Sequence, residues 1–288
     1  MTGDGVELAV IEAGDRRRPT VVLLHGYPDS KELWTGTVER LQPRLHVIAY
    51  DVRGFGASSA PRGPAAFSYE RLAGDLQAVV DELAPGRGFH LVGHDWGGIM
   101  GWGFAAMERF DGRMRSFTTI AGPSLEQVAR SQRELLRSGR VLEWVRRAYR
   151  SWYVLALCTP GLPTLTWRLL MSRGRWADSM RRVQGLPDDP YFSRPSLASD
   201  GIRGSNLYRR NIPPRVLGRR RDGAARVPVQ LIVPTEDHFI SSGYYEIAER
   251  YAPRLVRRSV AATHWVPHTH ADELARWITE FVEEVEST

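Results

Sequence analysis

Asp95 is the central residue of the segment GHDWGG, residues 93–98, which directly follows the apolar run Phe89 to Val92. Glycines on both sides of a central side chain permit a sharp strand-to-helix turn that lifts this side chain into a site. A serine here would favour acyl transfer, whereas a carboxylate attacks saturated carbon and becomes an alkyl ester. The segment therefore predicts a covalent aspartyl intermediate, with epoxides or alkyl halides as substrates.

An ordinary turn is the alternative for this segment, since glycine and aspartate are common in turns for local reasons. The surroundings of the segment favour a nucleophile over an ordinary turn. A buried-strand pattern ends at the segment, an apolar helical pattern continues from Ile99 to Met107, and acid and histidine residues follow later in the chain.

His264 and Asp237 are the predicted partners of Asp95. An aspartyl ester is released by water, and water needs a base. His264 follows the strand-like run Leu255 to Val260, and Asp237, which would orient it, follows Val229 to Val233. Nucleophile, acid and histidine then occur in the order expected for a strand-to-helix nucleophile of this kind. The competing residues are one acid and three histidines: Glu236, His238, His268 and His270.

Two backbone N–H groups are predicted to stabilise the tetrahedral oxyanion formed during ester hydrolysis. One belongs to Trp96, the residue after the nucleophile. The other belongs to Tyr27 in the segment HGYP, residues 25–28, which follows the strand-like run Val21 to Leu24. A plain strand-ending turn is the alternative for HGYP.

The elements around these residues alternate between strand and helix, which predicts an α/β fold with a mostly parallel sheet covered by helices on both faces. The alternation stops in the middle of the chain. We expect a core of residues 1–122 and 226–288 and an inserted helical cap of residues 123–225. The remaining strand-like runs are Leu8 to Ile11, His46 to Tyr50 and Ser116 to Ile120, and the helical runs are Lys31 to Leu41, Tyr69 to Leu83, Ile99 to Phe110 and Ala271 to Val285.

The composition of the 288 residues is that of a globular protein, with an uneven charge. Residues 130–226 contain 21 arginines and 7 acids, and we expect a solvated basic face here rather than a nucleic-acid or lipid site. Cys158 is the only cysteine, so neither a disulfide within the chain nor a cysteine metal cluster is expected. Neither a signal pattern nor a membrane span is recognisable, which predicts a cytoplasmic protein.

Taken together, these segments resemble the α/β-hydrolase superfamily and, within it, the epoxide hydrolases. The matching segments are HGYPDS at residues 25–30, DVRGFG at 51–56, the turn at 93–98, the acid loop and the terminal histidine, so the resemblance spans nearly the whole chain. The chain looks most like the hydrolase half of bacterial fusion proteins in which such a domain precedes a short-chain dehydrogenase. We expect only the hydrolase half in this sequence.

The resemblance implies two cap tyrosines that donate hydrogen bonds to the epoxide oxygen. In the family they lie in Ser-Trp-Tyr and Asn-x-Tyr-Arg segments, which correspond here to SWY ending at Tyr153 and NLYR containing Tyr208. Tyrosines that only pack in the cap are the alternative. The segment from Tyr153 to Met171 should line an apolar passage through these side chains: Val154, Leu155, Leu157, Leu162, Leu165, Trp167, Leu169 and Leu170.

Three other functions remain open. Haloalkane dehalogenases also have Asp-Trp in this turn, but many of them have asparagine where this chain has Tyr27. If this chain were such an enzyme, a cap tryptophan would supply the second N–H donor to the halide. The candidates are Trp144, Trp152, Trp167 and Trp176. A biosynthetic epoxide-processing enzyme and a non-catalytic ligand-binding protein are the others. We predict an epoxide hydrolase without cofactor or metal that acts on a small lipophilic epoxide and water. The oligomeric state is open, with a homodimer as one option.

Overall fold

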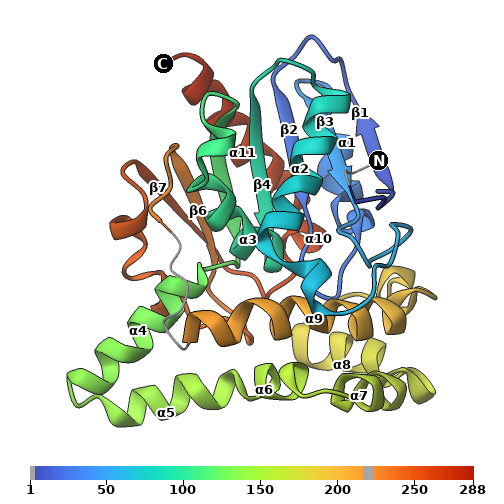
Figure 1. Cartoon of the computed structure of the whole chain (residues 1–288), viewed down its shortest axis with the longest axis vertical. Helices are drawn as coiled ribbons and strands as arrows, with labels where there is room; N and C mark the ends of the chain where they lie inside the picture. The colour runs from blue at the N-terminus through green and yellow to red at the C-terminus, as the bar shows by residue number, and fades with distance from the viewer. Residues whose placement is uncertain (1–3, 217–222) are drawn as a thin grey trace.

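The computed structural model describes residues 4–216 and 223–288, so residues 217–222 of the expected cap lie outside the described part. Its seven-stranded sheet has the order β1-β3-β2-β4-β5-β6-β7 (Figure 1). β1 pairs antiparallel with β3, and every other pair of neighbours is parallel, which confirms the predicted fold class. The strands are β1 (Val10–Ala13), β2 (Thr20–Leu24), β3 (His46–Tyr50), β4 (Phe89–His94), β5 (Met114–Ile120), β6 (Val229–Pro234) and β7 (Leu255–Val260).

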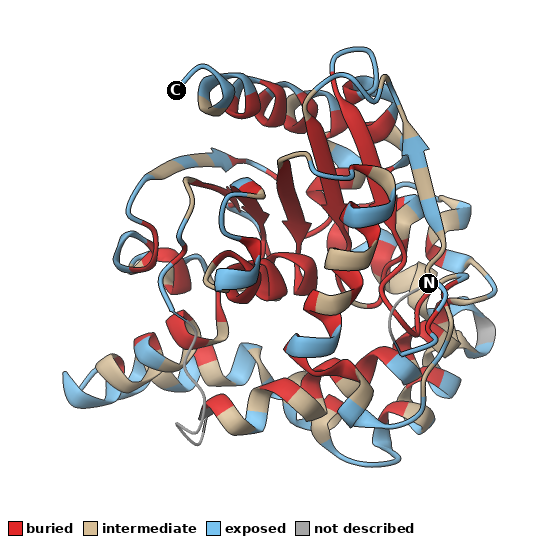
Figure 2. Ribbon diagram, turned by 45° about the horizontal axis from the view of Figure 1, so that its top comes forward, coloured by how far each residue is buried: buried red, intermediate tan, exposed pale blue. Residues whose placement is uncertain are grey.

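Helices cover both faces of the sheet, which explains why the central strands are apolar along their whole length. All residues of β2, β3, β4 and β6 are buried (Figure 2). Along β2, Val22 packs with α2 (Tyr69–Leu83) and α3 (Trp96–Ala105), whereas Val21 packs with α1 (Thr35–Leu41) and α11 (Ala271–Glu286). Successive side chains of a strand point to opposite faces, so both must be apolar when both are covered.

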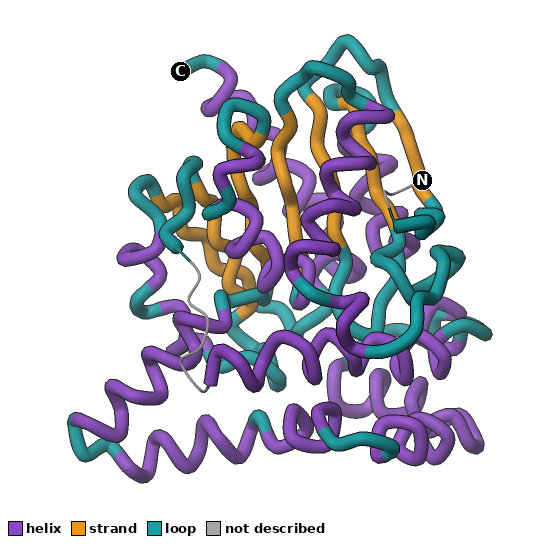
Figure 3. The backbone as a smooth tube through the Cα atoms, in the orientation of Figure 1, coloured by secondary structure: helices purple, strands orange, loops and turns teal. Residues whose placement is uncertain are grey.

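Among the described residues between β5 and β6, six α-helices form a layer across the ends of the strands (Figures 1 and 3). This layer is the cap. Its helices are α4 (Leu125–Arg137), α5 (Val141–Arg150), α6 (Trp152–Cys158), α7 (Leu162–Met171), α8 (Arg175–Gln184) and α9 (Leu197–Val216). One further short α-helix, α10 (Val266–Thr269), and seven 3₁₀ segments complete the described elements: Lys31–Trp34, Pro64–Phe67, Glu108–Phe110, Ser172–Gly174, Pro190–Ser193, Ser242–Tyr245 and Ala248–Tyr251.

The helix predicted from Ile99 to Phe110 differs from the observed one at both ends. α3 begins at Trp96, immediately after the turn, and ends at Ala105. Met107 then adopts extended backbone angles, φ −86° and ψ 129°, so Glu108–Phe110 forms a separate 3₁₀ turn. The apolar sequence pattern continues through this break, which explains why it concealed the end of the helix.

No single helix of the described residues combines the length and apolar character needed to cross a bilayer. α6 and α7 pass that test only as a pair, and the angle between them is 113°.

Candidate active site

Asp95 lies in a strained turn between β4 and α3, at φ 50° and ψ −118°. A positive φ is unfavourable for a residue with a Cβ and is maintained only where the surroundings enforce it. Here the Asp95 N–H donates to the carbonyl oxygen of Ile120 at 3.0 Å, which ties the turn to β5. A Cβ on Gly97 would collide with the carbonyl of Leu24, so this close approach requires glycine. The turn thus presents the Asp95 side chain at the carboxyl end of the sheet.

The structure brings Asp95, Asp237 and His264 together in one buried cluster. Nδ1 of His264 lies 2.8 Å from Oδ2 of Asp237, and Nε2 lies 3.6 Å from Oδ2 of Asp95. The other Asp237 oxygen, Oδ1, accepts the N–H groups of Phe239 at 2.7 Å and Ile240 at 3.0 Å. Asp237 is therefore held on both sides, and it fixes the orientation of the imidazole.

The competing residues lie elsewhere. Glu236 and His238, which flank Asp237, are exposed. His268 pairs with Asp189 at 3.3 Å, and His270 contacts the hydroxyl of Thr269. Within the described residues, no three His, Cys, Asp or Glu side chains are grouped as metal ligands would be.

His94 is a member of the site that the sequence reasoning missed. It is fully buried beside Asp95, its Nε2 donates to the backbone oxygen of His264 at 2.9 Å, and the two rings are 4.8 Å apart. The feature of the sequence that could have indicated His94 is its position directly before Asp95. His94 supports the backbone of His264, and its own pKa is lowered by burial and by the charge of His264.

The charges of this cluster favour a protonated His264. Burial opposes the imidazolium form, but the carboxylates of Asp237 and Asp95 outweigh it and raise the pKa of His264 to about 10. Burial likewise opposes the charged form of Asp237, yet the neighbouring His264 keeps the pKa of this carboxyl below its usual range. Two carboxylates therefore flank one cation in this cluster.

A backbone donor fixes one oxygen of Asp95. The Tyr27 N–H donates to Oδ1 at 2.8 Å, so the segment HGYP lies against the turn as its sequence position suggested. The Trp96 N–H, at the start of α3, makes no hydrogen bond to Asp95 in the described part of the chain. With Oδ1 held by Tyr27, Oδ2 is the oxygen that faces His264.

Tyr153 and Tyr208 extend from α6 and α9 into a cavity of about 270 Å³ that also contains Asp95 and His264. The ring of Tyr208 lies 4.8 Å from that of Trp96, and the ring of Tyr153 lies 5.9 Å from that of Phe239. Burial, and next the charge of Asp95, raise the pKa of both tyrosines. Their hydroxyls therefore remain protonated and able to donate.

The cavity is largely apolar, but only three of the eight side chains predicted to line it do so. Leu157, Trp167 and Leu170 line it, and Val154 packs against the core. The other four, Leu155, Leu162, Leu165 and Leu169, are exposed on the opposite side of α6 and α7. A helix can direct only one face inward, so an apolar run of this length cannot all face the cavity. The lining residues are Tyr27, Pro28, Asp95, Trp152, Tyr153, Ala156, Leu157, Pro163, Thr166, Trp167, Leu170, Trp176, Tyr208, Phe239, His264 and Trp265.

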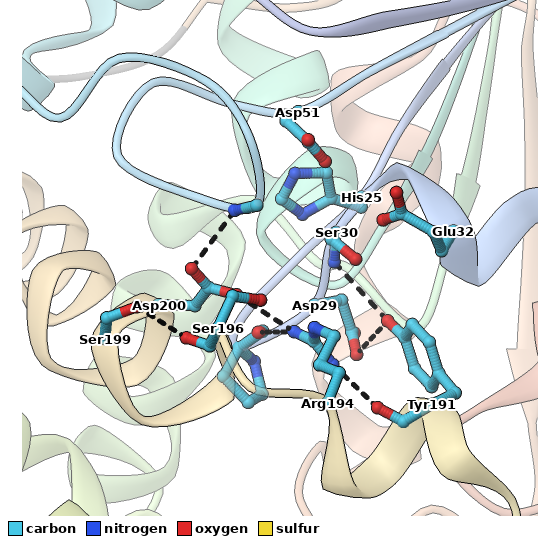
Figure 4. Close-up of polar contacts among 12 residues, drawn as sticks. His25, Asp29, Ser30, Glu32, Asp51, Tyr191, Arg194, Ser196, Ser199 and Asp200 are labelled. Carbon is cyan, nitrogen blue, oxygen red and sulfur yellow. Dashed lines mark hydrogen bonds and ion pairs between the residues drawn. The ribbon is translucent and has the colours of Figure 1, made fainter.

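Polar contacts from the cap hold the loop that bears the Tyr27 donor (Figure 4). The Tyr191 hydroxyl donates to Oδ1 of Asp29 at 2.8 Å, and Arg194 donates to the carbonyl oxygen of Pro28 at 2.6 Å. Arg194 is itself paired with Asp200 at 3.4 Å. The cap thus fixes Pro28 and Asp29, which follow Tyr27 in the chain. The position of the Tyr27 N–H therefore depends on how the cap packs against the core.

Comparisons with known proteins identify one family and several relatives. The family model for the alpha/beta hydrolase fold matches residues 19–271. A Mycobacterium tuberculosis protein named "Probable oxidoreductase EphD" is 33% identical over 287 residues, which are 97% of this chain and 48% of that protein. "Epoxide hydrolase A" of the same species is 31% identical over 183 residues, 63% of this chain and 52% of that protein.

The chain therefore spans about half the length of these curated relatives. Epoxide hydrolase VrEH1 from Vigna radiata superposes with a TM-score of 0.77 at 22% identity, covering 99% of this chain and 96% of that one. A Bacillus megaterium epoxide hydrolase with bound diol product gives a TM-score of 0.76 at 22% identity, covering 97% and 98%. These structural likenesses establish the fold.

Proposed function

Because the chain belongs to the α/β-hydrolase fold family, we propose that it is an epoxide hydrolase that forms a vicinal diol through an ester on Asp95. The observation that carries this proposal is the arrangement of Asp95, His264 and Asp237 beneath two protonated tyrosines in one cavity. The names of the relatives, several of them epoxide hydrolases, support it. The hydrolase half of a longer protein remains an expectation from the resemblance.

In the first step, Oδ2 of Asp95 attacks one carbon of the oxirane, because Oδ1 is engaged by the Tyr27 N–H. A C–O ester bond forms and the ring C–O bond breaks. The departing oxygen takes a proton from Tyr153 or Tyr208, whose high pKa keeps the hydroxyls protonated until this moment. The second tyrosine donates a hydrogen bond to the same oxygen.

Esterification neutralises Asp95, so His264 then loses its proton, which passes through solvent to the tyrosinate. In the second step, the neutral His264 takes a proton from water, and the hydroxide adds to the carbonyl carbon of the ester. The Tyr27 N–H already points at Oδ1, where the oxyanion charge develops, and the Trp96 N–H is assigned as the second donor. The ester C–O bond then breaks, and the diol oxygen takes the proton from His264. The proton of the new carboxyl group on Asp95 passes to His264, which restores the site.

Replacing Tyr153 or Tyr208 with Phe tests the epoxide assignment. Each change removes one hydroxyl from the cavity, and we expect epoxide turnover to fall by roughly 10²-fold, as for a positioned acid; the double variant should be nearly inactive. Steady-state diol formation measures this. Tyr149→Phe is the matched control, since Tyr149 is 75% exposed on α5. Wild-type rates in both single variants and in the double variant would exclude the proposed roles.

One observation favours haloalkane dehalogenation as a second candidate. The indole nitrogens of Trp96 and Trp176 are buried without a hydrogen bond of standard geometry in the described residues, and Trp176 lines the cavity. Such N–H groups could bind a departing halide. Trp167 is engaged elsewhere, because it donates to the Tyr27 hydroxyl at 2.6 Å. Halide release from bromoalkanes faster than diol formation from matched epoxides would favour this alternative.

The apolar cavity predicts the preferred substrates. Added methylenes that become fully buried contribute about 0.8 kcal/mol each, so kcat/KM should rise by up to about fourfold for each carbon in a series of terminal epoxides. Competition assays along the series measure this trend until the cavity of about 270 Å³ is filled. A flat or falling trend from the shortest member would contradict apolar recognition.

A further inference from the structure

Exposed large apolar side chains are concentrated on one part of this molecule. Of the twelve in the described residues, eleven lie in the cap between Leu136 and Val183, and Val10 is the exception. Apolar residues scattered singly over a surface are normal, whereas a concentration of this kind marks a site of interaction. Nine of them form the outer cap face: Val141, Leu142, Val145, Tyr149, Trp152, Leu155, Leu162, Leu165 and Leu169.

The outer cap face extends over three consecutive helices, each of which exposes apolar side chains. On α5, Val141, Val145 and Tyr149 are four residues apart and share one side. On α7, Leu162, Leu165 and Leu169 follow the spacing of three and four residues. The short α6 connects them with Leu155, which is 74% exposed. The three helices follow one another along the edge of the molecule farthest from the sheet (Figure 1).

The inner sides of α6 and α7 already face the cavity. Tyr153 and Leu157 of α6 and Trp167 of α7 line the cavity above Asp95, so the outward stripes cannot turn inward without dismantling the site. Trp152 belongs to both surfaces, since it lines the cavity and is 62% exposed. The outer cap face and the cavity therefore meet at Trp152.

The helices of the outer cap face carry an excess of positive charge. Residues 141–171 contain four arginines and one acid, and of these arginines only Arg147 is buried. Arg146 follows Val145 on α5, and Arg168 precedes Leu169 on α7; both are exposed, and neither has an ion pair within the described residues. Arginines beside an exposed apolar stripe are typical of helices that lie in the interface of an anionic bilayer.

We propose that the outer cap face docks onto an anionic lipid bilayer, with α5, α6 and α7 lying in the plane of its surface. The charge distribution favours this partner over a second copy of the chain, because a two-fold symmetric contact would place the arginines of one cap against those of the other. The sequence alone favoured a solvated basic face. The apolar stripes beside the arginines are what the structure adds.

Co-sedimentation with vesicles tests the proposal without using turnover, so its outcome is independent of the proposed function. The chain should bind vesicles of equimolar phosphatidylglycerol and phosphatidylcholine, bind phosphatidylcholine vesicles far more weakly, and be released by raised salt. Arg146→Gln with Arg168→Gln should weaken binding by about 30-fold, as expected for two arginines at an anionic surface. Leu155→Ser with Leu165→Ser should also reduce binding.

The matched control is Arg18→Gln with Arg109→Gln, which removes two exposed arginines outside the cap. This variant should bind nearly as well as the wild type. Equal binding to both vesicle types, or an equal loss in the control, would overturn the proposal. Analytical ultracentrifugation tests self-association as the alternative. If the wild type were a dimer that Leu155→Ser with Leu165→Ser dissociates, and if this variant bound vesicles as well as the wild type, the outer cap face would be assigned to self-association instead.

Discussion

Replacing Asp95 with Ala is expected to lower diol formation by about 10⁴-fold or more, because the proposed covalent route then lacks its nucleophile. Oδ2 of Asp95 is the carboxylate oxygen directed at His264 in the cavity, and among the described residues no other carboxylate lines that cavity. Residual activity would have to come from direct attack of water. Product formation from a chromogenic epoxide measures the loss.

Glu236→Ala is the matched control, since Glu236 is an exposed acid next to Asp237 and its loss should leave the rate unchanged. A single turnover of the wild type in heavy-oxygen water then identifies the nucleophile directly. The first diol should carry an oxygen from Asp95 and no label, while label enters the Asp95 side chain. Label in the first diol with none in Asp95 would establish direct hydrolysis.

Replacing His264 with Gln should affect the second step and leave the first largely intact. Without a base, hydrolysis of the ester is expected to slow by about 10²- to 10⁴-fold. The ester should then accumulate and be detected by mass spectrometry as an adduct on the peptide that contains Asp95. His238→Gln is the control, because His238 is exposed beside Asp237 and should yield no adduct. If His264→Gln with a turned-over epoxide gave no adduct, His264 would not be the base.

The charge balance at His264 predicts how the second step depends on pH. Before esterification, burial opposes the charge, but Asp237 and Asp95 hold the pKa of His264 at about 10, so the imidazole is protonated at neutral pH. Esterification neutralises Asp95 and removes one of these stabilising charges. The pKa should therefore fall in the intermediate, and ester hydrolysis should accelerate with rising pH until this lower value is passed. Rapid-quench measurement of ester decay across pH gives the profile, and a rate that decreases as pH rises would contradict it.

The local pattern of the sequence was sufficient for the sheet and for the positions of the candidate site residues. Central strands covered on both faces must be apolar throughout, which explains why the run His46–Tyr50 matches the observed strand. The run Leu255–Val260 also matches its strand, although β7 lies at the edge of the sheet and is only partly buried. The carboxyl ends of parallel strands meet at one edge of a sheet. Asp95, Asp237 and His264 each follow such a strand, so their order in the chain already implied that they lie near one another.

The tertiary structure alone decided which neighbours of these residues share the site. Glu236 and Asp237 are adjacent acids with similar sequence surroundings, but only Asp237 turns inward to His264. His94 likewise contacts the backbone of His264 across 170 positions of the chain, a distance that no local pattern conveys. Side-chain direction at a turn depends on the packing of distant segments, and the sequence pattern does not specify that packing.

The cap shows most clearly the difference between what the sequence pattern indicates and what the tertiary packing determines. Its sequence indicated helices, apolar residues and arginines, and these are intrinsic to the chain. Which apolar residues face the cavity and which face outward depends on how α6 and α7 rotate against α9 and the core. Leu157 turned inward and Leu155 outward although both lie in one apolar run. Composition determined that the cap is apolar and basic, and helix packing determined that these properties appear together on an exposed surface.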